Sequence, residues 1–512
     1  MSIHFVPNDP LAGAPAPQLR RKKPRPDRRA EGAGFTFHDP EPEGLYQPGT
    51  PGFLYWQCRE AALSALAAWE RDAGKISAWQ AGRKIDLWQN AVAQLGARPD
   101  LNAYYDRASL QFFEYFDGTK RSFSGASTDV VAHEAGHGLL DAIRPDLWDS
   151  PYLEAAAFHE AFGDCVALLT ALSDAKTRKA LLSAKPEKPN FVEATAEDLS
   201  DSIRRVAPAH NAAEPRRALN TLRWQLPSTL PADGGPGELI NESHSFARVF
   251  TGCFWDLLLR LLGDGAGSTA LRKATRTLAR LLVAGARTAP DGPRLFQAIG
   301  RAMTLADEES NGGANRVAIR EAFGAHGIAL GSNSLLAPSA SLAGAGPTLT
   351  AGSAALARLT VRDLSARIGA KPAARLEIRP RRLAGEQFAE ALHRREVSLT
   401  PLGAGLRGVV ALAPESVLVG VSGLRAAIVG GLPDRTSTED EVRTYVSGLL
   451  GHGRIQFDRR EVARVRGAEV PGWHSHAVKE SRGAKVLVRI RFSCGPAAPG
   501  RFNRRLPRSG RA

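Results

Sequence analysis

The sequence predicts an α+β protein, with a mostly α-helical domain that has a small β part, followed by a smaller α+β domain. Three observations support this prediction. Apolar residues recur at helical spacing in several long segments between residues 55 and 330. Residues 331–357 are small and turn-forming, as is typical of a linker. Beyond them the apolar period changes to two, the period of a half-buried strand.

The N-terminal part begins with a segment of low aliphatic content. Residues 1–50 are rich in Pro, Gly and charge, and we expect a disordered basic tail there. Apolar stripes predict amphipathic helices over 55–73 and 78–95. Two extended stretches follow at 101–105 and 110–116, separated by turn-forming residues.

Long helices are expected in the remainder of the first domain, residues 51–330. One spans about 127–143 and is ended by Arg144-Pro145, because proline disfavours helix at the preceding residue. A second spans 154–172. Residues 175–240 are polar and Pro-rich, as expected of a surface excursion, and helical spacing returns from 243 to 327.

The second domain is assigned to residues 358–495, with a basic tail at 496–512. Val486, Val488, Ile490 and Phe492 alternate with Leu487, Arg489 and Arg491, which predicts a half-buried strand. Glu439–Leu450 predicts a helix with a capping box at its start. No partner for this accessory domain is evident from the sequence.

Composition narrows the class of protein. The net charge of +14 comes mainly from Arg and is spread with Ala and Gly along the chain, and no aromatic residues interleave the basic runs, so we do not expect nucleic-acid binding. The four cysteines form no close pair, which argues against disulfides. No apolar run resembles a signal peptide or approaches the ~20 residues of a membrane span. We therefore expect a cytoplasmic location.

The segment His133-Glu134-Ala135-Gly136-His137 is the strongest chemical signal in the chain. On a helix, residues i and i+4 project from one face, so both imidazoles can reach one ion. Glu134 lies about 100° further round the helix and would sit beside that ion. This arrangement is the one that a zinc hydrolase needs.

The following helix supplies carboxylates for the same site. Glu160 lies 23 residues after His137, which leaves room for a loop and a returning helix, and can be the third metal ligand. Asp164 is one turn further on and can accept the second N–H of His133. The alternative reading is that these histidines are satisfied interior groups and that Glu160 is their ion-pair partner. Burying three ionisable groups without a metal or pairing is costly, which favours the metal site.

With these motifs in place, residues 55–330 resemble the thermolysin-like neutral metallopeptidases, the gluzincin type. Four segments, in the family's order, carry the resemblance: Asn102-Ala103-Tyr104-Tyr105, Asp129-Val130-Val131-Ala132-His133-Glu134, Glu160-Ala161-Phe162-Gly163-Asp164 and Ala322-Phe323-Gly324-Ala325-His326-Gly327-Ile328. The resemblance implies one catalytic Zn²⁺ held by His133, His137 and Glu160, with a helical lobe behind it. It also implies that the N-terminal β part is reduced relative to the family.

The resemblance further implies roles for individual residues. Glu134 would be the general base, and Asn102 and Ala103 would bind a polypeptide substrate along an edge strand. His244 matches the histidine that stabilises the oxyanion, and either Glu242 or Asp233 could support it. Tyr152 is near the position of the family's tyrosine donor. Arg223 is a match for the arginine that holds the substrate carbonyl.

Two departures from the family pattern bear on cofactors. His159 replaces the asparagine before the ligand glutamate, and a polar contact is expected of it. Ala171 replaces a glutamate of the family's calcium site, which argues against calcium although Asp129 is retained.

The sequence therefore predicts a zinc metallopeptidase. The alternative is a catalytically silent protein that keeps the peptidase fold and serves as a binding or scaffold module; the intact Glu134 argues against it.

Overall fold

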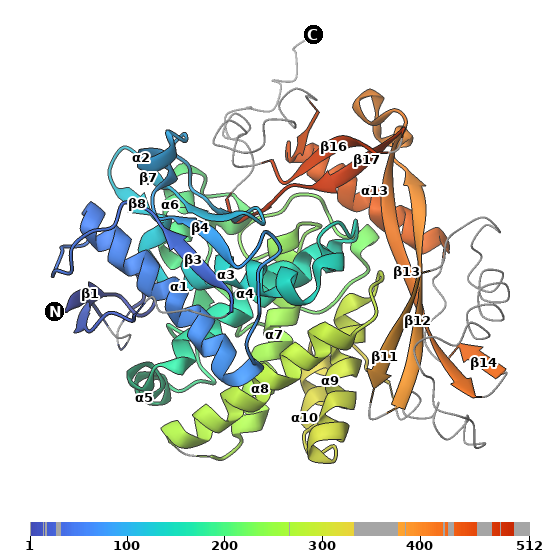
Figure 1. Ribbon diagram of the computed structural model, residues 1–512, viewed down its shortest axis with the longest axis horizontal. Helices are drawn as coiled ribbons and strands as arrows, with labels where there is room; N and C mark the ends of the chain where they lie inside the picture. The colour runs from blue at the N-terminus through green and yellow to red at the C-terminus, as the bar shows by residue number, and fades with distance from the viewer. Residues whose placement is uncertain are drawn as a thin grey trace, which may run out of the picture.

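The computed structural model describes most of the chain. The described residues are 2–13, 15, 18–26, 32–265, 267–331, 377–383, 386–422, 425–428, 435–457, 474–481 and 483–495. The linker expected at 331–357 and the basic tail expected at 496–512 therefore lie almost wholly outside them. Figure 1 shows helices gathered behind one small sheet, with a second, longer sheet beside them.

The small sheet has the strand order β18-β5-β6-β4-β3. Its members are β3 (Gly34–Phe37), β4 (Lys84–Trp88), β5 (Ala103–Tyr105), β6 (Ser109–Phe112) and β18 (Phe492–Ser493). The extended stretches predicted near 101–105 and 110–116 are confirmed; the second also contains β7 (Glu114–Phe116), which pairs with β8 (Arg121–Phe123).

The helix predicted over 78–95 is wrong for most of its length. Lys84–Trp88 is the strand β4, and only Ala91–Leu95 is helical (α2). In β4 the burial alternates, with Ile85 and Leu87 facing the core, and β4 is hydrogen-bonded to a strand on each side. Pairing within the sheet thus overrides the local helical spacing.

Residues 1–50 also differ from the disorder expected of them. Ile3–Phe5 (β1) pairs with Arg20–Lys22 (β2), and β3 joins the small sheet. Asn8 donates from Nδ2 to the carbonyl of Phe191 at 2.5 Å, and Ser127 donates to Asp9 Oδ2 at 2.9 Å. A few buried anchors therefore order a segment whose composition is otherwise that of a tail.

The helices make up the largest part of the fold. They are α1 (Pro51–Ala73), α3 (Thr128–Ile143), α4 (Leu153–Ser173), α5 (Ala175–Ala184), α6 (Glu197–Val206), α7 (Ser243–Leu262), α8 (Ser268–Thr288), α9 (Leu295–Asn311) and α10 (Arg316–Ala325). Among the described residues, α4 is the one helix long and apolar enough to cross a membrane, and that stretch is wholly buried. It is therefore a core helix.

The predicted surface excursion at 175–240 contains more regular structure than expected. Besides α5 and α6 it holds the short strands β9 (Ala194–Thr195) and β10 (Arg216–Arg217), which pair in antiparallel fashion. This pairing fixes the position of Arg216.

The C-terminal sheet is mixed, with the order β11-β12-β13-β17-β16-β15 and β14 paired to β13. Its strands are β11 (Glu377–Leu383), β12 (Glu386–Ser398), β13 (Val409–Ser422), β14 (Arg425–Ile428), β15 (Ile455–Gln456), β16 (His476–Ser481) and β17 (Ala484–Arg489), and α13 spans Arg435–Gly451. The α+β class is confirmed for both parts. Val397, Val409 and Val442 belong to the same apolar core cluster as the helices, so the two parts pack as one body.

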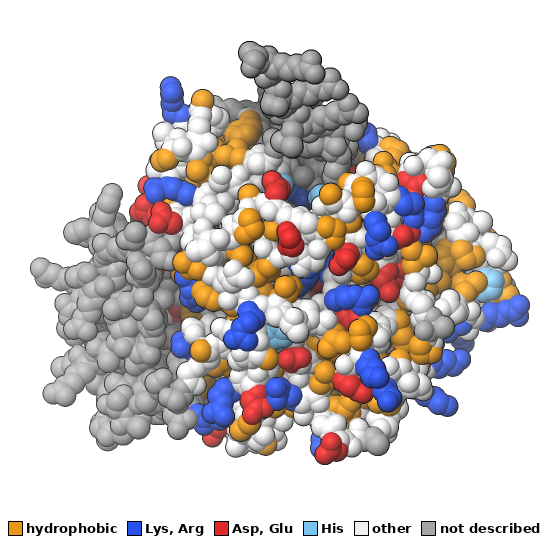
Figure 2. Space-filling model, turned by 180° about the vertical axis from the view of Figure 1, so that it is seen from behind, with side chains coloured by type: hydrophobic (Ala, Val, Ile, Leu, Met, Phe, Trp, Pro, Cys, Tyr) orange, Lys and Arg blue, Asp and Glu red, His pale blue; other side chains and the backbone are white. Residues whose placement is uncertain are grey.

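Charge is mixed on one face of the molecule. On the face shown in Figure 2, Lys and Arg side chains are interspersed with Asp and Glu. That distribution differs from the single-sign stripe by which nucleic-acid-binding proteins contact phosphates.

Candidate metal centre

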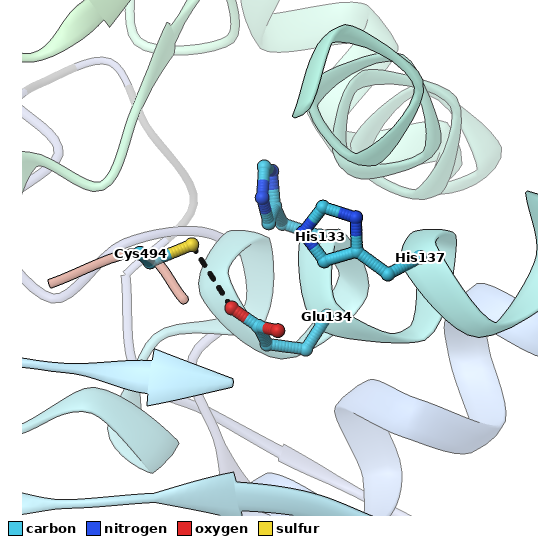
Figure 3. A group of neighbouring side chains, drawn as sticks. All are labelled: His133, Glu134, His137 and Cys494. Atoms are coloured by element: carbon cyan, nitrogen blue, oxygen red, sulfur yellow. Dashed lines mark hydrogen bonds between the residues drawn. The ribbon is translucent and has the colours of Figure 1, made fainter. Parts of the chain in front are cut away.

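The centre begins on α3, whose N-terminus is capped by Ser127. His133 and His137 project from one face of this helix, as the i, i+4 spacing predicts, and their rings lie 4.7 Å apart at 88° to each other. Glu134 projects beside them (Figure 3). All three side chains are buried.

Glu160 reaches the same point from α4. Its Oε2 lies 3.2 Å from His133 Nε2 and 3.6 Å from His137 Nε2. Two ligands of one tetrahedral zinc ion, each about 2.1 Å from the metal, are separated by about 3.4 Å. The three predicted ligands are thus brought together at distances that suit one ion.

The donor atoms of this cluster also fit a metal. Neither ring nitrogen of buried His137 has a hydrogen-bond partner in the described structure, and the same holds for Glu134 Oε2. Buried polar atoms without partners are costly, and coordination to a cation removes that cost for an imidazole nitrogen. Two imidazoles and a carboxylate are a common zinc donor set.

Asp164 lies where the sequence predicts it. Its Oδ1 is 2.8 Å from His133 Nδ1, so it can accept that N–H and orient the imidazole. Although burial alone lowers it, the hydrogen bonds with Asp164 and Glu160 raise the pKa of His133 to about 9.

Asp164 is itself held by Arg216, which the sequence analysis missed. Arg216 Nη2 donates to Asp164 Oδ1 at 2.8 Å, and Arg216 Nε donates to both carboxylate oxygens at 3.1 Å. Burial works against ionisation, but the Arg216 guanidinium and the hydrogen bond to His133 hold the pKa of Asp164 well below its usual range. The register of β10 on β9, which pairs Arg216 with Thr195, positions this arginine.

His244 is also at the centre, in the first turn of α7. Its Nε2 lies 3.1 Å from Glu160 Oε2, and its Nδ1 lies 2.8 Å from Glu242 Oε1. Glu242 also caps α7 by accepting from Ser245 N at 3.0 Å. Of the two carboxylates that the sequence left open, Glu242 is therefore the one that contacts His244, whereas Asp233 pairs with His452 at 2.7 Å.

These carboxylates determine the protonation of His244. Burial lowers its pKa, but Glu160 and Glu242 outweigh that effect and raise the pKa of His244 to about 10. The imidazolium is then a cationic donor beside the ligand carboxylate.

Two predicted residues are not brought to the centre. Tyr152 precedes the first residue of α4, more than two turns before Glu160, and the charges that act on it belong to Glu415, Asp291 and Glu441. Arg223 is exposed and donates to the carbonyl of Ala325 at 2.8 Å. The assignments of Tyr152 as a donor and Arg223 as a substrate ligand are therefore not supported by their positions.

A different arginine and a different tyrosine lie near the centre. Arg216 is the arginine beside the metal ligands. Tyr445, from α13, lines a small cavity with Glu160 and His244. Arg216 could have been suspected from the sequence as one of the basic residues near Arg223, together with Arg217, whereas Tyr445 carries no local signal.

The predicted edge strand is β5, and its outer edge is occupied. Phe492 and Ser493 of β18 pair in antiparallel fashion with Tyr105 and Tyr104. Asn102 and Ala103 also bond to this segment, since Cys494 N donates to the Ala103 carbonyl at 2.9 Å. His159, expected to make a polar contact, instead stacks on Phe492 at 4.1 Å.

A second group of carboxylates lies at the start of α3. One oxygen each of Asp9, Asp129 and Glu197 lies within 4.8 Å of the others. Burial is the largest cause of the raised pKa of all three groups. The sequence argument against calcium rested on Ala171, which replaces a glutamate of the family's calcium site. It did not consider Asp9 and Glu197, which lie beside Asp129.

The comparison with protein families agrees with this centre. Residues 106–333, slightly less than half of the chain, match the family model of the fungalysin metallopeptidases (M36). The matched range contains His133, Glu134, His137 and Glu160, whereas Asn102 and Ala103 lie before it. No curated protein matches the chain. Residues 106–333 thus match a metallopeptidase domain of the fungalysin type, and their buried His133-Glu134-His137 group fits a zinc site.

Proposed function

We propose that the protein is a zinc endopeptidase in which His133, His137 and Glu160 hold the metal and Glu134 is the general base. The observation that carries the proposal is the convergence of Glu160 Oε2 on both imidazoles, at 3.2 and 3.6 Å, from a different helix. If the two histidines shared a helix face only by chance, a third buried donor from another helix would not be expected beside them.

Each further residue has a role that follows from its contacts. Zinc in such a site polarises the scissile carbonyl and acidifies water. Glu134 takes the proton of the attacking water and passes it to the leaving amine. Burial raises the pKa of Glu134 to about 7, close to the value that favours a proton shuttle near neutral pH.

His244 is the donor for the developing oxyanion. Its Nε2 faces the ligand carboxylate, while Glu242 holds Nδ1 and favours the protonated ring. A preorganised donor of this kind is commonly worth about 3–4 kcal/mol of barrier. Asp164 and Arg216 are positioning residues, because Asp164 accepts from His133 and Arg216 holds Asp164.

The test compares the zinc-loaded full chain with Glu134→Gln on a peptide library. Removing the base should leave zinc stoichiometry unchanged and lower cleavage by at least about 100-fold. Equal cleavage by the two proteins would overturn the role of Glu134. Zinc binding without cleavage of any library peptide would favour the alternative, a catalytically silent binding module.

A further inference from the structure

The segment Phe492–Gly495 lies where the proposed peptidase needs its substrate. Its strand β18 adds to the outer edge of β5, which is a general way for proteins to bind extended peptides. Cys494 N donates to the Ala103 carbonyl at 2.9 Å. Gly495 N donates to Asn102 Oδ1 at 2.6 Å, and Ser493 donates to the same oxygen at 3.1 Å.

Cys494 directs its thiol at the metal centre. Sγ donates to Glu134 Oε1 at 2.9 Å (Figure 3). It lies within 4.8 Å of the donor atoms of His133 and His137, and equally of those of Glu160 and His244. One sulfur thus faces all three proposed ligands and the base.

Phe492 fills the adjoining part of the cleft as a substrate side chain would. Its ring stacks on His137 at 4.7 Å and on His159 at 4.1 Å, and meets Trp148 edge-on at 5.3 Å. The Arg489 guanidinium covers the ring at 4.1 Å. Phe492 is 1% exposed, so solvent does not reach the metal centre from this side.

The segment is anchored at both ends. Before it, Arg489 Nε donates to the Trp148 carbonyl and Trp148 Nε1 to the Arg489 carbonyl, each at 3.1 Å. After it, Arg454 Nη2 donates to the Gly495 carbonyl at 2.8 Å. Gly495 approaches so closely that a Cβ there would lie 2.5 Å from Asn102 Cγ. These contacts hold the thiol in one position.

We propose that Phe492–Gly495 is a built-in, substrate-like inhibitor of the peptidase, in which Cys494 supplies the fourth zinc ligand. This inference rests on the proposed function. Two imidazoles, a carboxylate and a thiolate complete a tetrahedral set, whereas a catalytic site must keep one position open for water and substrate. The chain is therefore latent while the segment occupies the cleft.

The thiol must lose its proton to bind zinc, because thiolate is the ligand form of cysteine. Glu134 already accepts the Cys494 hydrogen bond, so its carboxylate takes that proton as the S–H bond breaks. Glu134 is thereby protonated, and Cys494 also covers it. Beyond Cys494 an open cavity of about 390 Å³, lined by Arg216 and His244, continues the cleft.

The ligand assignment is tested on the full-length zinc protein by X-ray absorption at the zinc edge. We expect one sulfur at about 2.3 Å in the wild type, lost in Cys494→Ser and retained in Cys58→Ala. Cys58 is another buried cysteine, on α1, and serves as the control. A wild-type spectrum without sulfur at full zinc occupancy would overturn the proposal.

Inhibition is tested by peptide hydrolysis. Cys494→Ala should cleave on the order of tenfold or more faster than the wild type, because a larger fraction of molecules has an open cleft. Gly495→Ala retains Cys494 but forces the segment away from Asn102, and it should be activated in the same direction. Equal rates in the wild type and both variants would overturn the inhibitory role.

Failure of the two proposals can be told apart. Activation that Glu134→Gln abolishes in the Cys494→Ala background supports both. A sulfur ligand that is lost in Cys494→Ser, with no cleavage by any variant, would leave Cys494 as a zinc ligand and remove the peptidase assignment.

Discussion

Gly136 of α3 and Gly163 of α4 face each other where the two ligand-bearing helices cross. A Cβ at Gly136 would lie 2.8 Å from Gly163 Cα, and a Cβ at Gly163 would lie 2.7 Å from His133 Nδ1. The cost of glycine inside these helices, about 1 kcal/mol each, is thus offset by an approach that lets Glu160 reach both imidazoles.

Gly163→Ala should therefore disturb the metal centre and the helix packing together. We expect a loss of about 1–3 kcal/mol in the free energy of unfolding, as for other overpacked cores. Zinc affinity should fall at least about tenfold, because His133 is displaced from Asp164. Chemical denaturation and zinc competition with a chelating dye measure the two effects.

Gly324→Ala provides the matched control, since a Cβ at this position on α10 meets nothing within 4 Å. It should leave zinc affinity unchanged and stabilise the protein slightly. If Gly163→Ala bound zinc as tightly as Gly324→Ala, close helix approach would not be what positions His133.

Arg216→Ala should weaken zinc binding by about 10–100-fold, the usual effect of removing a residue that orients a metal ligand. The cause is the loss of three hydrogen bonds that hold Asp164 against His133. Arg216→Lys keeps the charge but not the paired geometry, and should recover only part of the affinity. Calorimetric titration with zinc measures the series.

Arg223→Ala is the control for that series. Arg223 is exposed and contacts the Ala325 carbonyl, so its loss should leave zinc affinity unchanged. The reverse order, with Arg223→Ala the weaker zinc binder, would contradict the role given to Arg216.

The predicted site residues that the structure brings together on neighbouring turns lie on regular helices. His133, His137, Glu160 and Asp164 are separated by helical periods, so their shared face follows from 3.6 residues per turn. Arg216 and Arg223 both lie outside helices, in a stretch where no period tells which side chain turns inward. Their positions in the sequence therefore do not tell which of the two arginines lies at the metal centre.

Cys494 could not have been predicted to lie in the cleft, because 360 residues separate it from Glu134. Its position depends on how the β16–β17 hairpin docks on Trp148, a contact between distant segments. The same limit applies to β4: its role in the sheet comes from partners on either side, while its local spacing favours a helix.

Glu242→Gln should lower the pKa of His244 toward its ordinary value of about 6.5. Glu242 is one of the two carboxylates that raise it to about 10, and the amide carries no charge to stabilise the imidazolium. Histidine proton NMR of the metal-free protein follows the titration. Asp233→Asn is the control, because Asp233 pairs with His452 and should leave His244 unchanged.

The same change predicts a stability difference with a definite sign. A raised histidine pKa stabilises the fold below about pH 6.5 and loses that contribution as the pH rises through about 10. The wild type should therefore exceed Glu242→Gln in free energy of unfolding near pH 7, and the gap should narrow toward pH 10. A gap that widened with pH would contradict this assignment.

Glu197→Gln should stabilise the protein at alkaline pH. Burial and the nearby Asp129 raise the pKa of Glu197 to about 8, and its Oε2 has no hydrogen-bond partner among the described residues. A raised carboxyl pKa means that ionisation costs folding energy, so the wild type loses stability as the pH rises from about 4.5 through 8.

The measurement is made in the presence of a chelator, so that no cation offsets the charges of Asp9, Asp129 and Glu197. At pH 9 the melting temperature of the variant should exceed that of the wild type. The difference should shrink at pH 6, and the exposed Glu187→Gln should show neither effect. Identical melting of wild type and Glu197→Gln at pH 9 would show that the three carboxylates do not repel one another in the folded chain.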